Sequence, residues 1–170
     1  ALGYAPEPPE GNEATLRQEQ SAYLDGKVTW RHITLPLTDD EQIKIELLLF
    51  LPNDRPGPHP IFFGLNFMGN HTVTEDPLVP LSERWIPARG EGVVNNRATQ
   101  ESRGTSADRW PVELITGRGY ALATLYHGDI DPDNEDETNG IQAHHRNPDW
   151  TERDDHEWGT LAAWVWGLQR

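Results

Sequence analysis

A parallel β-sheet is predicted by residues 106–126, which read Ser106-Ala-Asp-Arg-Trp-Pro-Val-Glu-Leu-Ile-Thr-Gly-Arg-Gly-Tyr-Ala-Leu-Ala-Thr-Leu-Tyr126. The first part predicts a helix, which Ser106 or Asp108 can cap and which Gly117 or Gly119 can end as a left-handed residue. Its apolar face would be Trp110, Leu114 and Ile115. The apolar run at the end predicts a strand. Because a helix followed by such a strand is half of a βαβ crossover, the stretch indicates an α/β fold.

Three apolar runs upstream of this helix are predicted to be further strands. Val28–Leu37 and Ile43–Pro52 are rich in β-branched and apolar residues, and the acidic turn at Asp39-Asp40 is short enough to join them as an antiparallel pair. Ile61–Phe67 is a short apolar strand that leads into a loop. With the strand at Tyr120–Tyr126, the sequence predicts a mixed sheet of four strands.

The remaining segments are predicted to be mostly irregular. Residues 1–22 are polar and proline-rich, so we expect an extended lead-in with a short helix around Glu13–Gln20. Residues 72–105 lack periodicity, which is typical of a functional loop or an insertion. Residues 127–149 are acidic and predicted to be a loop. Residues 23–170 are therefore predicted to be the amino-terminal portion of one α/β domain, incomplete at its carboxyl-terminal end.

The last predicted element is an amphipathic helix. Thr151-Glu-Arg-Asp154 has the pattern of a capping box, and an apolar stripe follows at spacings of three and four. The stripe consists of Trp158, Leu161, Ala162, Val165 and Leu168. Trp164 and Trp166 cannot both lie on it. The order of elements predicts the amino-terminal part of an α/β-hydrolase three-layer sandwich, in which the strand that bears the nucleophile would come next.

Composition limits the function classes. The chain has 170 residues, of which 35% are hydrophobic and 25% are charged, as in soluble globular domains. Its formal net charge of −14 repels polyanions, so nucleic acid is not an expected partner. The apolar runs are far shorter than the roughly 20 residues that a membrane-spanning helix needs, so no membrane is expected either.

Cysteine usage and the amino terminus bear on the compartment. The chain has no cysteine, which excludes disulfides and a thiolate zinc site. Residues 1–10 have neither a basic nor an apolar leader region, so no signal peptide is present in this form. A mature secreted or periplasmic protein is expected, although a cytoplasmic protein would look the same.

A complete catalytic triad is not predicted within this chain. The four serines are Ser21, Ser82, Ser102 and Ser106. None of them lies in a Gly-x-Ser-x-Gly turn between a strand and a helix, which is the context that makes a serine nucleophilic in this fold.

Four segments of the chain together resemble the glucuronoyl esterases, carbohydrate esterase family 15. They are Gly64–Thr72, Arg109-Trp-Pro, Gly119–Asp133 and Trp158–Leu168. The most specific parts are the Tyr-x-Gly-Asp-Ile-Asp-Pro-Asp run that ends at Asp133 and the Trp-Gly…Ala-Trp-x-Trp-Gly-Leu helix. The resemblance covers most of residues 20–170 in order.

The resemblance implies a serine esterase without metal or other cofactor. Its substrate would be the ester between the 4-O-methylglucuronate of glucuronoxylan and lignin alcohols. The family's serine follows shortly after the Trp158–Leu168 helix, and its acid and histidine come later. All three are therefore expected beyond Arg170, in a carboxyl-terminal part of the same protein that is covalently joined or held as a nicked fragment.

The candidate site residues in this chain follow the third predicted strand. They are Asn66, Phe67, Met68, Gly69, Asn70 and His71. A backbone N–H of such a loop often faces the developing oxyanion in α/β hydrolases. The alternative is that Asn66 and Asn70 only satisfy the backbone of a turn. His71 precedes the expected serine, whereas the triad histidine follows it in this fold, so His71 is predicted to be structural or to line a pocket.

Other polar clusters are weaker candidates. Asp129, Asp131 and Asp133 have the spacing that opens a calcium-binding EF-hand loop, but Asn134 and Gly140 stand where that loop needs Gly and Glu. The pair His144-His145 with Asp149 and His156 could form a metal cluster, although adjacent residues rarely converge on one ion. No metal site is therefore predicted. Trp85 or Trp150 could stack on a sugar, with packing as the commoner role.

Two other functions stay open from the sequence. One is an acetyl xylan esterase or another carbohydrate esterase on the same fold. The other is a non-catalytic carbohydrate-binding or scaffold protein. An incomplete parallel sheet with an open edge argues against the second, because such an edge invites aggregation unless another segment covers it.

Overall fold

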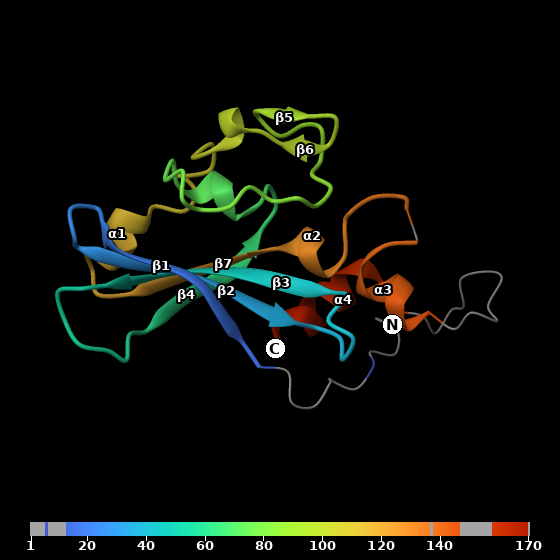
Figure 1. Ribbon diagram of the computed structural model, residues 1–170, viewed down its shortest axis with the longest axis horizontal. Coiled ribbons are helices and arrows are strands. Elements are labelled where there is room, and N and C mark those ends of the chain that lie inside the picture. Colours follow the sequence, from blue (N-terminus) through green and yellow to red (C-terminus); the bar gives the residue numbers. More distant parts are fainter. Residues whose placement is uncertain (1–5, 7–12, 137, 147–157, 170) are drawn as a thin grey trace.

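A five-stranded mixed sheet is the centre of the computed structural model, which describes residue 6 and residues 13–136, 138–146 and 158–169. The strand order is β1-β2-β3-β7-β4 (Figure 1). The strands are β1 (Thr15–Tyr23), β2 (Val28–Pro36), β3 (Lys44–Pro52), β4 (Ile61–Asn66) and β7 (Ala121–Tyr126). Neighbours are antiparallel except for β4 and β7, which run parallel. The predicted mixed sheet is confirmed.

The β2–β3 hairpin forms as the sequence predicts. Its register runs without a bulge from Val28 opposite Pro52 to Pro36 opposite Lys44. The turn is closed by a backbone hydrogen bond from Leu37 N to the Ile43 carbonyl at 2.8 Å. Period-two alternation puts alternate side chains on opposite faces, so both faces of the hairpin can be packed.

The amino-terminal segment differs from the prediction. The helix expected around Glu13–Gln20 is wrong, because Thr15–Tyr23 is the edge strand β1, paired with β2. Residues 15–22, which we expected in an extended lead-in, are extended but belong to the sheet. Most side chains of β1 are polar on both of its faces. Some of them contact polar side chains of the neighbouring strand β2, as when Arg17 Nε donates to Thr34 Oγ1 at 3.0 Å.

The crossover between β4 and β7 contains a shorter helix than expected. Helix α1 comprises only Val112–Thr116, without a side-chain cap from Ser106 or Asp108. Pro111 explains the late start, since a residue before proline is disfavoured in helical geometry. Gly119 has φ +83° and ends the turn in the left-handed region, as predicted. Leu114 is exposed, so the predicted apolar face is wrong at that position.

Residues 127–149 also contain helices that the sequence analysis missed. Helix α2 (His127–Ile130) follows β7 directly, and helix α3 (Gly140–His145) comes after it. The predicted capping box at residues 151–154 lies outside the described residues. Helix α4 (Thr160–Leu168) begins after Gly159 without a side-chain cap.

The buried face of α4 is not the predicted stripe. Leu161 and Val165 are 65% and 52% exposed. Trp164 and Trp166, which were predicted not to share the apolar stripe, are both buried. Their indoles reach different partners, because Trp164 meets Phe67 and His127, whereas Trp166 meets Trp158 and His145.

Helices and loops cover both faces of the sheet, in three layers. One face packs against α2, α3 and α4 through a cluster that includes Leu37, Ile45, Leu125, Ile141 and Trp164. The other packs against α1 and residues 73–79 through a cluster that includes Trp30, Leu48, Phe50, Leu122 and Val112. Figure 1 shows α1 with β5 and β6 on one side of the sheet and α3 with α4 on the other.

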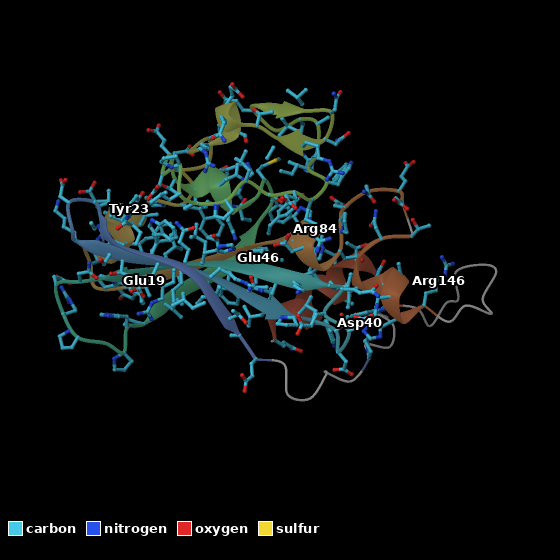
Figure 2. All side chains as sticks on the ribbon, viewed as in Figure 1. Glu19, Tyr23, Asp40, Glu46, Arg84 and Arg146 are labelled. Carbon is cyan, nitrogen blue, oxygen red and sulfur yellow. The ribbon has the colours of Figure 1, made fainter. Side chains whose placement is uncertain are left out.

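Residues 72–105 are mostly irregular, as predicted. They contain only short elements, namely η1 (Asn70–Val73), β5 (Val93–Val94), β6 (Arg97–Ala98) and η2 (Gln100–Ser102). This region overlies one face of the sheet. In Figure 2, Arg84 marks this region and Glu46 marks the strand β3 below it. Within the described part of the chain, no helix has the length and apolarity needed to cross a membrane.

Candidate active site

The parallel strands β4 and β7 end side by side, with Asn66 opposite Tyr126. In open α/β sheets, ligands bind in the crevice outside the carboxyl ends of parallel strands. Two segments lie at this edge, namely the loop 66–71 after β4 and helix α2 after β7. The Phe67 and His127 rings lie 4.9 Å apart, which joins the two segments.

Asn66 fixes the loop after β4 from within. Its side chain is buried; Oδ1 accepts the Met68 N–H at 2.9 Å, and Nδ2 donates to the Gly69 carbonyl at 2.9 Å. Gly69 has φ +96°, and a Cβ there would come within 2.6 Å of the His71 ring. The geometry agrees with the turn-satisfying role for Asn66. It also commits the Met68 N–H to the turn.

Asn70 ties the loop to two strands. Its Nδ2 donates to the Glu46 carbonyl of β3 at 2.6 Å, and its Oδ1 accepts from the Thr124 hydroxyl of β7 at 2.9 Å. Both ends of the amide are therefore used within the fold. Asn70 holds the loop against the sheet edge.

His71, the last residue of the loop, has no exposed surface. Its Nδ1 accepts a long hydrogen bond of 3.5 Å from the Ser82 backbone N–H, and its Nε2 has no partner among the described residues. Burial, with a smaller effect from Arg103, lowers the pKa of His71 to about 4. The ring is therefore neutral at ordinary pH, and this position fits the predicted structural role.

Phe67 is the aromatic residue of the loop that faces solvent in part, with 37% exposure. Its ring also contacts Trp164 at 5.8 Å in an edge-on arrangement. The loop therefore offers the crevice an aromatic surface that packing from behind holds in place.

The sequence analysis missed His127, which directly follows β7. Its ring is buried among Tyr126, Phe67 and Trp164, at centroid distances of 4.6–4.9 Å. Burial lowers its pKa, and neither ring nitrogen makes a hydrogen bond of normal geometry within the described chain. A histidine directly after an apolar strand was the available signal. The sequence predicts an acidic loop at this position, which gives no reason to expect a buried ring.

Asp129 is another functional group that the sequence analysis did not single out for this site. Its side chain is only 6% exposed, and Oδ2 accepts the Glu46 backbone N–H at 3.2 Å. Arg84 Nε lies 3.8 Å from Oδ1. Burial raises the pKa of Asp129 to about 7. A carboxyl group that titrates near neutrality at a sheet edge is typical of functional sites.

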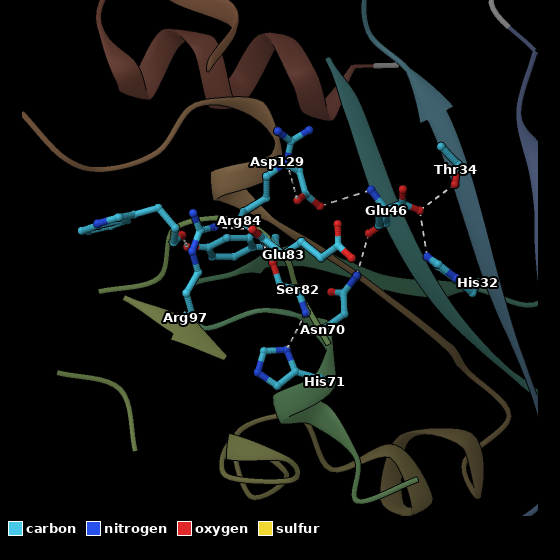
Figure 3. A network of polar contacts seen from close by, with 12 residues as sticks. His32, Thr34, Glu46, Asn70, His71, Ser82, Glu83, Arg84, Arg97 and Asp129 are labelled. Carbon is cyan, nitrogen blue, oxygen red and sulfur yellow. Dashed lines mark hydrogen bonds and ion pairs between the residues drawn. The ribbon is translucent and has the colours of Figure 1, made fainter. Parts of the chain in front are cut away.

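Glu46 extends this polar network along β3 (Figure 3). Its Oε2 contacts His32 Nε2 at 2.7 Å and accepts from Thr34 Oγ1 at 2.6 Å. These hydrogen bonds lower the pKa of Glu46 against the opposing effect of burial. The network lines a pocket of about 460 Å³ between the sheet and residues 79–84.

The candidate metal residues do not converge. Asp129 contacts β3, whereas the Asp131 side chain accepts the Gln142 N–H. The His145 ring packs against Trp158 and Trp166, and Asp149 and His156 lie outside the described residues. Within the described chain, no group of three histidine or carboxylate side chains could hold a metal ion.

The serines and loop tryptophans of the chain are used elsewhere. The Ser82 hydroxyl accepts the Arg84 N–H, and the buried Ser102 hydroxyl donates to the Thr99 carbonyl. No serine hydroxyl in the described part of the chain makes a hydrogen bond to a histidine side chain. The Trp85 carbonyl accepts the Tyr126 hydroxyl at 2.6 Å, which fixes the loop over the sheet, and Trp150 lies outside the described residues.

Comparison with known proteins gives relatives among the carbohydrate esterases. Carbohydrate esterase MZ0003, from an unknown prokaryotic organism, is 44% identical over 90% of this chain and 41% of its own length. A glucuronoyl esterase from Solibacter usitatus is 36% identical over 99% of this chain and 42% of its own, with a TM-score of 0.85. A promiscuous CE15 esterase from the marine bacterial metagenome is also 36% identical over 99% of this chain and 42% of its own, with a TM-score of 0.82.

A more distant structure supports the fold alone. The CE15 glucuronoyl esterase from Teredinibacter turnerae T7901 is 20% identical over 99% of this chain and 37% of its own, with a TM-score of 0.64. No protein-family model matches the chain. The chain spans about two fifths of the length of these relatives. The resemblance predicted from the sequence is confirmed, and the fold matches the amino-terminal portion of the α/β-hydrolase domain in these esterases.

Proposed function

We propose that this chain is the amino-terminal portion of a serine esterase that hydrolyses 4-O-methylglucuronoyl esters between xylan and lignin alcohols. One observation carries the proposal. The strand order β1-β2-β3-β7-β4, with a parallel pair at its end, superposes on a glucuronoyl esterase at a TM-score of 0.85 with 36% identity. Sequence and backbone therefore agree over nearly the whole chain.

The mechanism proposed for the whole protein is acyl transfer. A serine oxygen would attack the ester carbonyl, and a histidine would take the serine proton and pass it to the departing alcohol. Water would then release the free uronate from the acyl-enzyme. The serine, the acid and the histidine would come from the rest of the protein, which is joined to residues 1–170 or held as a nicked fragment.

The sheet edge supports a partner segment of this kind. Ile61, Phe62 and Phe63 are consecutive on β4 and all three are exposed, so both faces of the first half of the strand are open to solvent in the described chain. Strands of parallel sheets are normally buried on both faces. We propose that the rest of the hydrolase domain pairs with β4 and covers these side chains.

The loop 66–71 is assigned a supporting role in this mechanism. Asn66 fixes the backbone that would face the oxyanion, and Phe67 would line the mouth of the site. In the whole protein, Asn66→Ala should lower kcat about 10–100-fold with little change in KM, because misplacing a catalytic amide by a fraction of an ångström has effects of this size. An unchanged kcat in a folded variant would remove the loop from the mechanism.

The first test is hydrolysis by the full-length protein. We expect release of free uronate from the methyl ester of 4-O-methylglucuronic acid. Acetate release from acetylated xylan without uronate release would instead favour an acetyl xylan esterase, an alternative that stays open because one similar structure is of a promiscuous CE15 esterase. Xylan binding without hydrolysis of either ester would favour a non-catalytic carbohydrate-binding protein.

The proposed substrate also suggests the compartment. Plant cell-wall polymers are outside the bacterial cytoplasm, so we propose that the mature protein is secreted or periplasmic. Fractionation of the producing cells, with immunodetection of the protein, tests this. Retention in the cytoplasm would contradict it.

A further inference from the structure

The pocket beside the candidate active site has the size and lining of a ligand site. Its volume is about 460 Å³, within the roughly 300–1,000 Å³ of small-molecule sites. His32, Lys44 and Glu46 of the β2–β3 hairpin line one wall, and residues 79–84 line the other. Asp129, which follows the carboxyl end of β7, also lines the pocket.

Two carboxylates of the lining retain free hydrogen-bonding capacity. The contacts of the Glu46 carboxylate run through Oε2, which leaves Oε1 without a hydrogen bond among the described residues. Asp129 Oδ1 lies 3.8 Å from Arg84 Nε, which is longer than a hydrogen bond. Asp129 lines the pocket and is only 6% exposed, so a ligand in the pocket could donate a hydrogen bond to Oδ1.

The charges around the pocket favour an uncharged ligand with many hydroxyls. The lining holds carboxylates from Glu46, Glu83 and Asp129 together with the cations of Lys44 and Arg84. An anion or a cation would meet like charges in this wall. A hydroxyl can donate to a carboxylate and accept from a cation, so a chain of sugar hydroxyls can use both kinds of group.

The position of the pocket relates it to the proposed ester site. Glu46 lies on β3, and β7 separates β3 from β4. Two strand spacings put the pocket about 10 Å from β4, along the same edge of the sheet. A short saccharide chain can span that distance. The two sites can therefore hold different parts of one substrate.

We propose that this pocket binds neutral sugar residues of the xylan chain that bears the esterified uronate. Glu46, Asp129 and Glu83 accept hydrogen bonds from the sugar hydroxyls, and Lys44 donates to them. The proposal rests on the proposed function for the identity of the sugar, because the substrate of the ester site determines which chain reaches the pocket.

The test compares a short and a long ester in the full-length protein. The short substrate is the methyl ester of 4-O-methylglucuronic acid, and the long one is the same ester carried on a xylo-oligosaccharide. Asp129→Asn should lower the ratio of kcat/KM for the long ester to that for the short ester about 10-fold, the loss of a hydrogen bond to a charged group. Glu83→Ala, at an exposed position that should not affect folding, should lower the ratio about 3-fold.

Matched control variants lie outside the pocket. Asp54→Asn and Glu91→Ala remove exposed carboxylates that do not line it. Both controls should keep the wild-type ratio for the two esters. An unchanged ratio in Glu83→Ala and Asp129→Asn, or an equal drop in the controls, overturns the subsite.

A binding measurement separates failure of the subsite from failure of the proposed function. NMR titration of the wild-type protein with a neutral xylo-oligosaccharide should give saturable binding that Glu83→Ala weakens. Hydrolysis of both esters without this binding would overturn the subsite and leave the esterase intact. Binding without hydrolysis of either ester would overturn the esterase and leave a sugar-binding pocket.

Discussion

The two faces of the central sheet are packed with different chemistry. The face under α3 and α4 is closed by apolar side chains, and the buried indole of Trp164 has a close partner there, since its Nε1 donates to the Asp131 carbonyl at 2.7 Å. The opposite face is apolar around Trp30 and Phe50. It becomes polar toward Glu46 and Asp129 (Figure 3).

This difference separates stability from function. Burying a carboxyl group costs free energy. The first face does not bear this cost, because the large side chains buried there are indoles. The second face keeps Asp129 nearly buried although Arg84 is no closer than 3.8 Å. A fold tolerates such a group where a ligand or a reaction uses it. Substitutions on the first face should therefore change stability more than those on the second.

Trp164→Ala on the apolar face should have the largest effect. It removes a buried indole that packs on Phe67 and His127, so the free energy of unfolding should fall by about 3–5 kcal/mol. Urea denaturation of the full-length protein measures this loss. Val165→Ala, one position along the same helix but 52% exposed, should cost less than about 1 kcal/mol. Equal losses in the two variants would show that α4 does not pack as described.

Gly69→Ala in the loop after β4 should have an intermediate effect. The backbone at Gly69 has φ 96° and ψ 149°, a region that side chains rarely adopt, and the new Cβ would meet the His71 ring. The expected loss is about 2–3 kcal/mol. Gly26→Ala is the matched control, because Gly26 also has positive φ (+79°) but open space around it, and it should cost about 1 kcal/mol. A smaller loss at Gly69 than at Gly26 would contradict the contact with His71.

The elements that the sequence predicted well are those with a clear period. The β2–β3 hairpin and the strands β4 and β7 are apolar runs bounded by turn residues, so local pattern and tertiary position agree. Edge strand β1 was missed because neither of its faces is apolar. Helix α1 was overestimated because Pro111 delays its start. In α4, long indoles reach past neighbouring residues, so spacing alone did not identify its buried face.

The candidate site was predictable only in part. The loop 66–71 could be located because it follows a strand, and in the structure it directly follows β4. The environment of Asp129 could not be predicted, since its partner is the backbone N–H of Glu46, 83 residues earlier in the chain. The burial of His127 likewise depends on Trp164 of α4. Contacts this distant in sequence leave no local pattern.

The pH dependence of wild-type stability should show the smallest net effect, because two buried groups contribute slopes of opposite sign. Burial raises the pKa of Asp129 from 3.8 to about 7, so its contribution to stability is complete below pH 4 and is lost as the pH rises toward 7. Burial lowers the pKa of His71 from 6.5 to about 4, so its contribution is complete above pH 6.5 and is lost as the pH falls toward 4. The two slopes oppose each other, and each is at most about 1.4 kcal/mol per pH unit.

Single substitutions should separate these slopes. The free energy of unfolding of Asp129→Asn, relative to wild type, should rise by about 1 kcal/mol per unit between pH 4.5 and 6, because the variant lacks the falling contribution. That of His71→Phe, relative to wild type, should fall over the same range. Since His127 is present in both backgrounds, its titration cancels in these differences. Urea denaturation at several pH values measures these differences. If the difference in unfolding free energy between Asp129→Asn and wild type does not change with pH, the Asp129 carboxyl group is solvated and its burial costs no free energy.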